Sequence, residues 1–324
     1  MWFFGSKKAS SSSSSFSWSS TAEEVTHGVN GTGLTAIVTG ASSGMGAEVT
    51  RVLALRGVEV IMADINIVAG NLIRAKILDE IPSANLHLME LDLSSMASVK
   101  NFASNYKSSH LFLNILINNA GVLSPPFILS KDNIEMHFAT NYLGHFLLTH
   151  LLLDTMKNTA LQSGKEGRIV NVTSSAHKYT PREGISFDKL RNPSGYSKYS
   201  RFSAYCQSKL AIILHANELA KQLKNDGIEI IANSVDPGFV KNTNIIKLNI
   251  FLDALGIILK PYIKELPQGA ATTCYVALNP EVKGISGKYF SNSNLAKPSK
   301  QTQDVVLAQK LWDYTMDLIT NHAH

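Results

Sequence analysis

Tyr205 and Lys209 are the residues of this 324-residue chain whose spacing best suits acid–base chemistry. They stand four positions apart in SAYCQSKLAIILHANELAKQL, a stretch predicted to be helical, so both side chains lie on one face. A phenol with a pKa of about 10 is a weak base at neutral pH unless a cation stabilises the phenolate. Lysine can supply that cation. A solvated tyrosine beside a lysine would have the same spacing, so the surrounding elements must decide between the two.

A glycine-rich turn near the N-terminus indicates what such a pair would act with. The apolar run LTAIVTG enters a turn that contains Gly40, Gly44 and Gly46, and a helix is predicted over residues 47–56. A second apolar run, VEVIMAD, then ends at Asp64. Glycines permit a tight turn and close approach of a pyrophosphate, while the helix start offers free N–H groups. The unit therefore predicts a dinucleotide site, with an ordinary turn before a helix as the alternative.

The rest of the chain alternates strand-like and helix-like runs without a linker. Further strands are predicted at NLHLMELDL, LNILINNAG, GRIVNVTSS, GIEIIANSVDPG and SGKYF. This order predicts an α/β fold: a single-domain, Rossmann-type doubly wound parallel sheet, with ligands at the carboxyl ends of the strands.

The spacing TGxxxGxG from Thr39 to Gly46, together with NNAG and YxxxK, resembles the short-chain dehydrogenase/reductase (SDR) family. The resemblance covers residues 31–324, which we expect to form the catalytic domain. The segments MWFFG, TAEEVTHG and PQGAATTCYVAL are similar to the plant retinol-dehydrogenase-like branch. That branch includes the short-chain dehydrogenase of the chloroplast inner-envelope protein-import translocon.

The resemblance implies a catalytic set of Asn141, Ser174, Tyr205 and Lys209. Ser174 would hold the substrate oxygen, Tyr205 would exchange the proton, and Lys209 would also bind the nicotinamide ribose. Asn141 would hold a water chain to the lysine from a kinked helix. An asparagine that only bends its helix is the alternative. Ser175 is the alternative to Ser174, because Thr173, Ser174 and Ser175 adjoin.

The resemblance also implies the cofactor-binding residues. They come from the glycine turn, the ends of the following strands and a Pro-Gly loop over the nicotinamide. In that loop Asn242 replaces the family's threonine, which leaves its contacts open. The expected set is Gly40, Ser42, Ser43, Gly44, Met45, Gly46, Asp64, Asp92, Leu93, Asn119, Ala120, Gly121, Tyr205, Lys209, Pro237, Gly238 and Val240.

Asp64 predicts NAD as the preferred cofactor, with NADP as the alternative. A carboxylate at the end of the second strand accepts hydrogen bonds from the ribose hydroxyls and repels a 2′-phosphate. The arginine usual in this branch is replaced by Ile65, and Ser43 stands where many NADP-using members carry a base. The alternative role for Asp64 is only to cap the helix that starts near Asn66.

The composition and residue spacing of the chain also bear on its partners, on membrane insertion and on metal binding. The net charge of +5 has no dense basic block, so nucleic acid is not an expected partner. No apolar run reaches the roughly 18–20 residues of a membrane span. Cys206 and Cys274 lack disulfide-framework or zinc spacing, and the histidines suggest no metal site. The Ser-rich residues 1–30 are expected to form a flexible tail, with a plastid-targeting signal as the alternative.

We therefore expect an NAD(P)-dependent oxidoreductase acting on a small lipophilic alcohol or ketone. The apolar segment over residues 243–265 is expected to be a substrate lid, with an ordinary amphipathic helix as the alternative. The expected location is cytoplasmic, with the chloroplast as the alternative, and the expected assembly is a homodimer or homotetramer. A second hypothesis is a cofactor-binding, redox-sensing regulatory subunit of a membrane or import complex. The tyrosine–lysine pair favours the enzyme.

Overall fold

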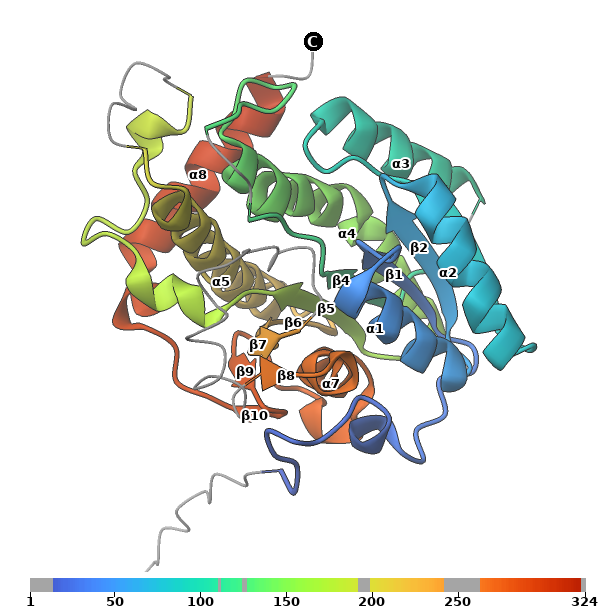
Figure 1. The fold of residues 1–324 in the computed structure, drawn as a ribbon. Helices are drawn as coiled ribbons and strands as arrows, with labels where there is room; N and C mark the ends of the chain where they lie inside the picture. Colours follow the sequence, from blue (N-terminus) through green and yellow to red (C-terminus); the bar gives the residue numbers. More distant parts are fainter. Residues whose placement is uncertain (1–13, 110–111, 124–126, 192–198, 242–262, 322–324) are drawn as a thin grey trace, which may run out of the picture.

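An eight-stranded sheet forms the centre of the molecule (Figure 1). The computed structural model describes residues 14–109, 112–123, 127–191, 199–241 and 263–321. The strand order is β10-β9-β6-β5-β4-β1-β2-β3, and all neighbours are parallel except β9 and β10. The predicted α/β fold with a doubly wound sheet is confirmed. The strands are β1 (Thr35–Thr39), β2 (Glu59–Asp64), β3 (Leu86–Glu90), β4 (Ile115–Asn118), β5 (Gly167–Val172), β6 (Ile230–Asp236), β9 (Tyr289–Ser291) and β10 (Asn294–Leu295).

Helices cover both faces of this sheet, and α5 and α7 lie on opposite sides of it (Figure 1). The longer helices are α1 (Gly44–Leu55), α2 (Ile67–Glu80), α3 (Met96–Ser109), α4 (Gly144–Ser163), α5 (Arg201–Asn225), α7 (Leu266–Leu278) and α8 (Val305–Asn321). The short ones are η1 (Glu24–Thr26), η2 (Phe138–Leu143), η3 (Ser175–Tyr179), η4 (Phe187–Lys189), η8 (Pro280–Val282) and η9 (Lys300–Gln303).

Two cores result from the alternation of side chains along the strands. Ile37 of β1 packs in one core with α3, α4, α5 and α8, whereas Ala36 and Val38 pack in the other with α1 and α7. Every residue of β1 is buried. A strand with both faces covered is apolar along most of its length, which explains the near-continuous apolar runs in the sequence.

Residues 14–30 do not form the flexible tail that we expected. Ala22 and Val25 are buried in the core beneath α7, and the Phe16 ring lies 5.7 Å from the Tyr275 ring. The Ala22 amide donates to the Pro267 carbonyl at 2.8 Å. Phe16 interrupts the serine tract, Ala22 and Val25 follow it, and together they bury surface that a purely polar tail could not. Residues 1–13 lie outside the described part of the chain.

The predicted lid, residues 243–265, lies outside the described residues except for its end. Ile263–Lys264 forms β8, which pairs in parallel with β7 (Phe239–Val240) directly after the Pro-Gly loop. None of the helices that the structure describes is long and apolar enough to cross a membrane. Among the same residues, no group of three or more His, Cys, Asp or Glu side chains is placed to hold a metal ion.

Candidate active site

The glycine turn between β1 and α1 has the geometry that its residue types predict. Gly40 and Gly44 have positive φ angles of 69° and 53°, a region that side chains rarely adopt. A Cβ atom at Gly46 would lie 2.1 Å from the Gly40 carbonyl oxygen. The Ser43 side chain makes no capping hydrogen bond to α1. The helix start therefore lies close against the turn, with amide groups suited to a phosphate.

The end of β4 is tied to this turn by Asn119. Its Nδ2 donates to the Thr39 carbonyl at 2.8 Å, and the amides of Asn119 and Ala120 both donate to Thr39 Oγ1 at 2.9 Å. A Cβ atom at Gly40 would lie 3.0 Å from the Cα of Ala120, its nearest neighbour. These contacts from the end of β4 thus fix the conformation of the glycine turn. In the part of the chain that is described, Asn119 Oδ1 is buried without a hydrogen-bond partner.

Asp64 ends β2 directly beside the turn. Its Oδ2 accepts a hydrogen bond from the Ser42 amide and its Oδ1 from the Asn66 amide, each at 2.9 Å. The cap of α2 is Asn66, whose side chain accepts from the Ala69 amide. Asp64 therefore does not cap that helix itself, and it links the glycine turn to the following loop. The adjacent Ile65 is 60% exposed.

Asp92 and Leu93 follow β3. The Asp92 carboxylate accepts hydrogen bonds from Ser94 and from Lys131 Nζ. Burial raises the pKa of Asp92, but these hydrogen bonds outweigh it and hold the pKa below its usual value. A Cβ at Gly144 would lie 2.3 Å from the Leu93 carbonyl oxygen. Gly144 thereby lets α4 approach this edge of the sheet.

Tyr205, Lys209 and Ser174 meet at the carboxyl end of β5. Lys209 Nζ lies 5.6 Å from the centre of the Tyr205 ring and donates to the Val172 carbonyl at 3.1 Å. The Ser174 hydroxyl accepts a hydrogen bond from the Ala176 amide at 3.2 Å, and its interaction with the Tyr205 phenol lowers the pKa of Tyr205. Ser174 is therefore the serine of the adjoining pair that acts on the pKa of the phenol. The tyrosine and lysine are 7% and 2% exposed, which rules out the solvated pair considered above.

Burial dominates the electrostatics of this group. It raises the pKa of Tyr205 to about 12, although the interaction with Ser174 lowers it. It lowers the pKa of Lys209 to about 8, partly opposed by the negative charge of Asp236. A phenolate here therefore needs additional positive charge. Oxidised nicotinamide would bring such a charge.

Asn141 lies in η2, which is a π-helical turn immediately before α4. Its Oδ1 accepts from the Val122 amide at 2.7 Å, and its Nδ2 donates to the Val122 carbonyl and to Ser208 Oγ, each at 3.0 Å. A Cβ at Gly121 would lie 3.4 Å from both Asn141 Oδ1 and Lys209 Nζ. Asn141 thus lies in a π-helical turn, and it joins the loop after β4 to the helix that carries the lysine.

His145 is one contributor that the sequence reasoning treated as an ordinary histidine. Its Nδ1 donates to the Asn141 carbonyl at 3.0 Å, so Nε2 accepts from Thr39 Oγ1 at 2.8 Å. Burial lowers the pKa of His145 to about 4, which keeps the ring neutral. The ring thereby connects the glycine turn to the π-helical turn. Its place four residues after Asn141 was the only signal in the sequence.

The Pro-Gly loop lies at the end of β6. Gly238 has a φ of 79°, and its amide donates to Asp236 Oδ1 at 3.0 Å. Lys264 is 1% exposed, packs against Gly238, and donates to Asn292 Oδ1 at 2.8 Å. Pro237 is buried with them, and Val240 is 3% exposed in β7. Sequence reasoning missed Asp236 and Lys264, because neither belongs to the family motif.

A buried polar cluster beside Tyr205 was also missed. Glu135 Oε1 accepts from His137 Nδ1 at 2.6 Å and from the Tyr199 hydroxyl at 2.7 Å. The His137 ring packs edge-on against the Tyr205 ring, with centres 6.4 Å apart. Burial raises the pKa of Glu135, but its hydrogen bonds outweigh this and lower it. The cluster braces the ring of the proposed acid–base residue.

A glycine turn of the dinucleotide type, facing a Ser–Tyr–Lys group across the ends of parallel strands, defines a nicotinamide-dependent dehydrogenase site. The chain belongs to the short-chain dehydrogenase/reductase family. The family model described as short chain dehydrogenase matches residues 34–187.

Individual relatives match over nearly the whole chain. The Brassica napus protein named "Short-chain dehydrogenase TIC 32 B, chloroplastic" is 47% identical, over 98% of this chain and 99% of its own length. Human retinol dehydrogenase 11 is 36% identical, over 89% of this chain and 86% of its own. A solved structure of an uncharacterised Mycobacterium paratuberculosis protein matches with a TM-score of 0.72 and 29% identity, covering 91% of this chain and 97% of that one. The predicted family and branch are confirmed.

Proposed function

We propose that this protein transfers a hydride between a nicotinamide cofactor and a lipophilic secondary alcohol or ketone, with NAD preferred over NADP. The observation that carries the proposal is the arrangement of the half-buried Ser174 with the buried Tyr205 and Lys209. A module that only bound the cofactor would have no need of a phenol with an ammonium 5.6 Å from its ring.

In the oxidation direction, the Ser174 hydroxyl holds the alcohol oxygen beside Tyr205. The Tyr205 phenolate takes the hydroxyl proton as the C–H bond breaks and the C=O double bond forms. Oxidised nicotinamide, if bound, would supply the hydride acceptor. Lys209 stays charged and stabilises the phenolate. In the reverse direction Tyr205 returns the proton to the carbonyl oxygen.

The cofactor fits the residues present. The close contact between Gly46 and Gly40, together with the start of α1, suits a pyrophosphate. Asp64 would accept hydrogen bonds from the ribose hydroxyls with the lone pairs that the Ser42 and Asn66 amides do not use. Asn141 and His145 would hold Lys209 and the glycine turn in fixed positions relative to each other.

The preference for NAD rests on Asp64 and Ile65. A 2′-phosphate would meet the 8%-exposed Asp64 carboxylate as a like charge, which costs several kcal/mol at such a contact. The test is kcat/KM with NAD and NADP for the native protein and for Asp64→Ala combined with Ile65→Arg. The double variant should shift preference toward NADP. A native enzyme that already prefers NADP would refute the assignment.

The lipophilic substrate class is supported by the similarity to a protein named retinol dehydrogenase and by the apolar composition of residues 243–265. The test is an oxidation screen with NAD over terpenoid- and steroid-sized alcohols and small polyols. We expect activity only with the bulky apolar alcohols. Equal activity on both sets would refute the substrate class while leaving the hydride transfer intact.

We place the protein in the chloroplast rather than the cytoplasm. The Brassica napus relative is named chloroplastic, and the match extends over 98% of this chain. A fluorescent fusion at the C-terminus, expressed in leaf cells, should co-localise with plastids. Diffuse cytosolic fluorescence would contradict this location.

A further inference from the structure

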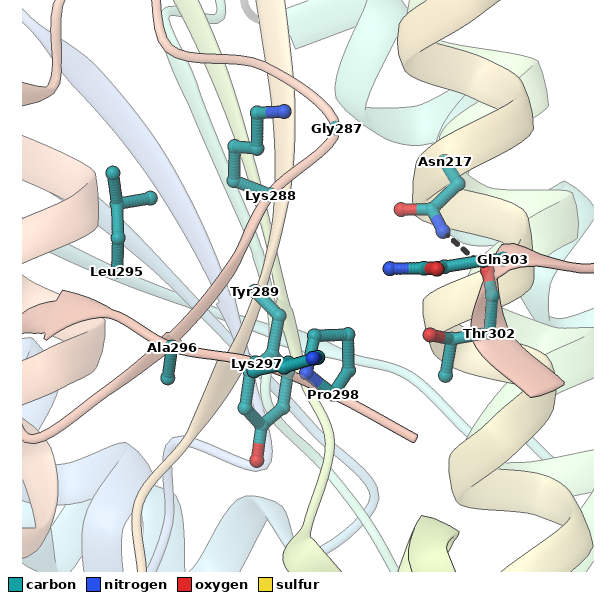
Figure 2. Close-up of a pocket in the computed structure, with 10 residues that line it drawn as sticks. All are labelled: Asn217, Gly287, Lys288, Tyr289, Leu295, Ala296, Lys297, Pro298, Thr302 and Gln303. Atoms are coloured by element: carbon teal, nitrogen blue, oxygen red, sulfur yellow. Dashed lines mark hydrogen bonds between the residues drawn. The ribbon is translucent and has the colours of Figure 1, made fainter. Parts of the chain in front are cut away.

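A cavity of about 460 Å³ lies outside the active site, between α5 and the segment that follows β10 (Figure 2). Its size falls within the range of small-molecule sites. Figure 2 shows two facing walls: Leu295 and Ala296 with Lys288 and Tyr289 on one side, and Asn217, Thr302 and Gln303 on the other. The Asn217 Nδ2 group closes the second wall by donating to the Thr302 carbonyl at 2.8 Å.

The charged side chains that line this cavity are all positive. Lys288 and Lys297 are among its lining residues, and none of those residues is acidic. Neither ammonium group has an ion pair or side-chain hydrogen bond with another residue in the described ranges. The Gln303 amide points into the space between the walls (Figure 2). Two such cations beside an apolar surface favour a ligand that is both anionic and partly apolar.

The apolar part of the lining is built from Leu295, Pro298 and the Tyr289 ring. Leu295 is 52% exposed, so part of its apolar side chain is open to solvent. A ligand with a short hydrocarbon portion would cover this side chain.

One wall of the cavity is bonded to the catalytic strand end through His177. The Ser299 amide, next to Pro298, donates to His177 Nε2 at 3.0 Å, and His177 Nδ1 donates to the Ser174 carbonyl at 2.7 Å. The Tyr289 ring lies 5.3 Å from the His177 ring. His177 is fully buried and close-packed, so a displacement of Ser299 or Tyr289 would also displace the His177 ring. The hydrogen bond from that ring would then move the backbone of Ser174.

We propose that this cavity binds a small organic anion, with a carboxylate or phosphate at Lys288 or Lys297 and an apolar portion against Leu295 and Tyr289. Occupancy is transmitted to Ser174 through Ser299 and His177. None of the residues that line the cavity belongs to the proposed catalytic or cofactor-binding set.

The probe is octanoate, with inorganic phosphate as the anion that lacks an apolar part. Calorimetry should detect octanoate binding to the full chain saturated with NADH. The double variant Lys288→Glu with Lys297→Glu should weaken that binding by about tenfold or more, because two attractions become repulsions. A matched variant with the same change of net charge, Lys224→Glu with Lys283→Glu, should bind octanoate as the native chain does. No binding, or equal binding by the double variant, would overturn the site.

Inorganic phosphate should bind more weakly than octanoate, and equal affinities would overturn the apolar half of the assignment.

The link from the cavity to His177 is tested by a separate NMR measurement. In protein labelled with ¹⁵N-histidine, the His177 imidazole signals, assigned with His177→Gln, should shift on octanoate addition. They should not shift in the Lys288→Glu/Lys297→Glu variant. Binding without any His177 shift would overturn the transmission to Ser174. Neither readout requires turnover, so the proposed hydride transfer can fail or succeed independently.

Discussion

The carboxylate of Asp236 accepts a hydrogen bond from the Tyr289 hydroxyl at 3.0 Å. Its other oxygen accepts from the Gly238 amide, and the side chain is buried behind the Pro-Gly loop. The negative charge raises the pKa of both Tyr205 and Lys209. One carboxylate outside the proposed catalytic set therefore acts on both members of the acid–base pair.

Asp236→Asn should move the pH profile of alcohol oxidation to lower pH. Loss of the carboxylate lowers the pKa of Tyr205, so the phenolate forms at lower pH and the acid limb of kcat/KM moves down. The pKa of Lys209, now about 8, also falls, so the ammonium is lost earlier and the alkaline limb moves in the same direction. Asparagine retains an acceptor for the Gly238 amide. The exposed Asp226→Asn is the control, and an unmoved profile in Asp236→Asn would contradict the electrostatic role.

Tyr205→Phe should lower kcat by roughly 10²–10⁴-fold, which is the usual contribution of a general acid–base group. The dissociation constant for NAD should change little, because the ring and its contact with His137 remain. Steady-state kinetics and fluorescence titration of the cofactor measure the two quantities separately. A variant with near-native kcat would remove Tyr205 from the mechanism.

Glu135→Gln should lower the free energy of unfolding at neutral pH by about 1–3 kcal/mol, because a buried carboxylate that accepts several hydrogen bonds is replaced by a neutral amide. The pKa of Glu135 is depressed in the folded state, so its contribution is complete above the ordinary carboxylate pKa. That contribution is lost as pH falls through the lower folded value.

Urea unfolding at neutral and acidic pH measures this difference, which should shrink in acid. Glu229→Gln is the control, because Glu229 is exposed to solvent just before β6. A pH-independent difference between Glu135→Gln and the native protein would contradict the ionised state of Glu135.

Gly46→Ala should destabilise the protein by about 1–3 kcal/mol, the usual cost of overpacking a close contact. The new Cβ would lie 2.1 Å from the Gly40 carbonyl, so the turn or α1 has to move, and NAD affinity should fall with stability. Gly121→Ala is the control for stability alone, because its Cβ meets neighbours only at 3.4 Å and beyond. Thermal unfolding compares the two variants, and NAD titration compares Gly46→Ala with the native protein. Equal stability for the two would show that Gly46 is not required for close packing.

The sequence by itself determined the order of the elements and the residues at the strand ends. Periodicity is a local property, so apolar runs such as those of β1 and β4 identify buried parallel strands without any knowledge of their neighbours. The glycine spacing specifies a turn through backbone freedom, and the Tyr205–Lys209 spacing specifies a shared helix face. All of these constraints act within a few residues of the chain.

The tertiary structure alone decided which polar groups join the site and what state each is in. Glu135, His137 and Tyr199 become one buried cluster only when η2 packs against the start of α5. Asp236 reaches Tyr289 across two neighbouring strands, and residues 14–30 dock only because α7 presents an apolar surface. The effect of a charge depends on its burial and on partners far away in sequence, and neither is encoded in local spacing.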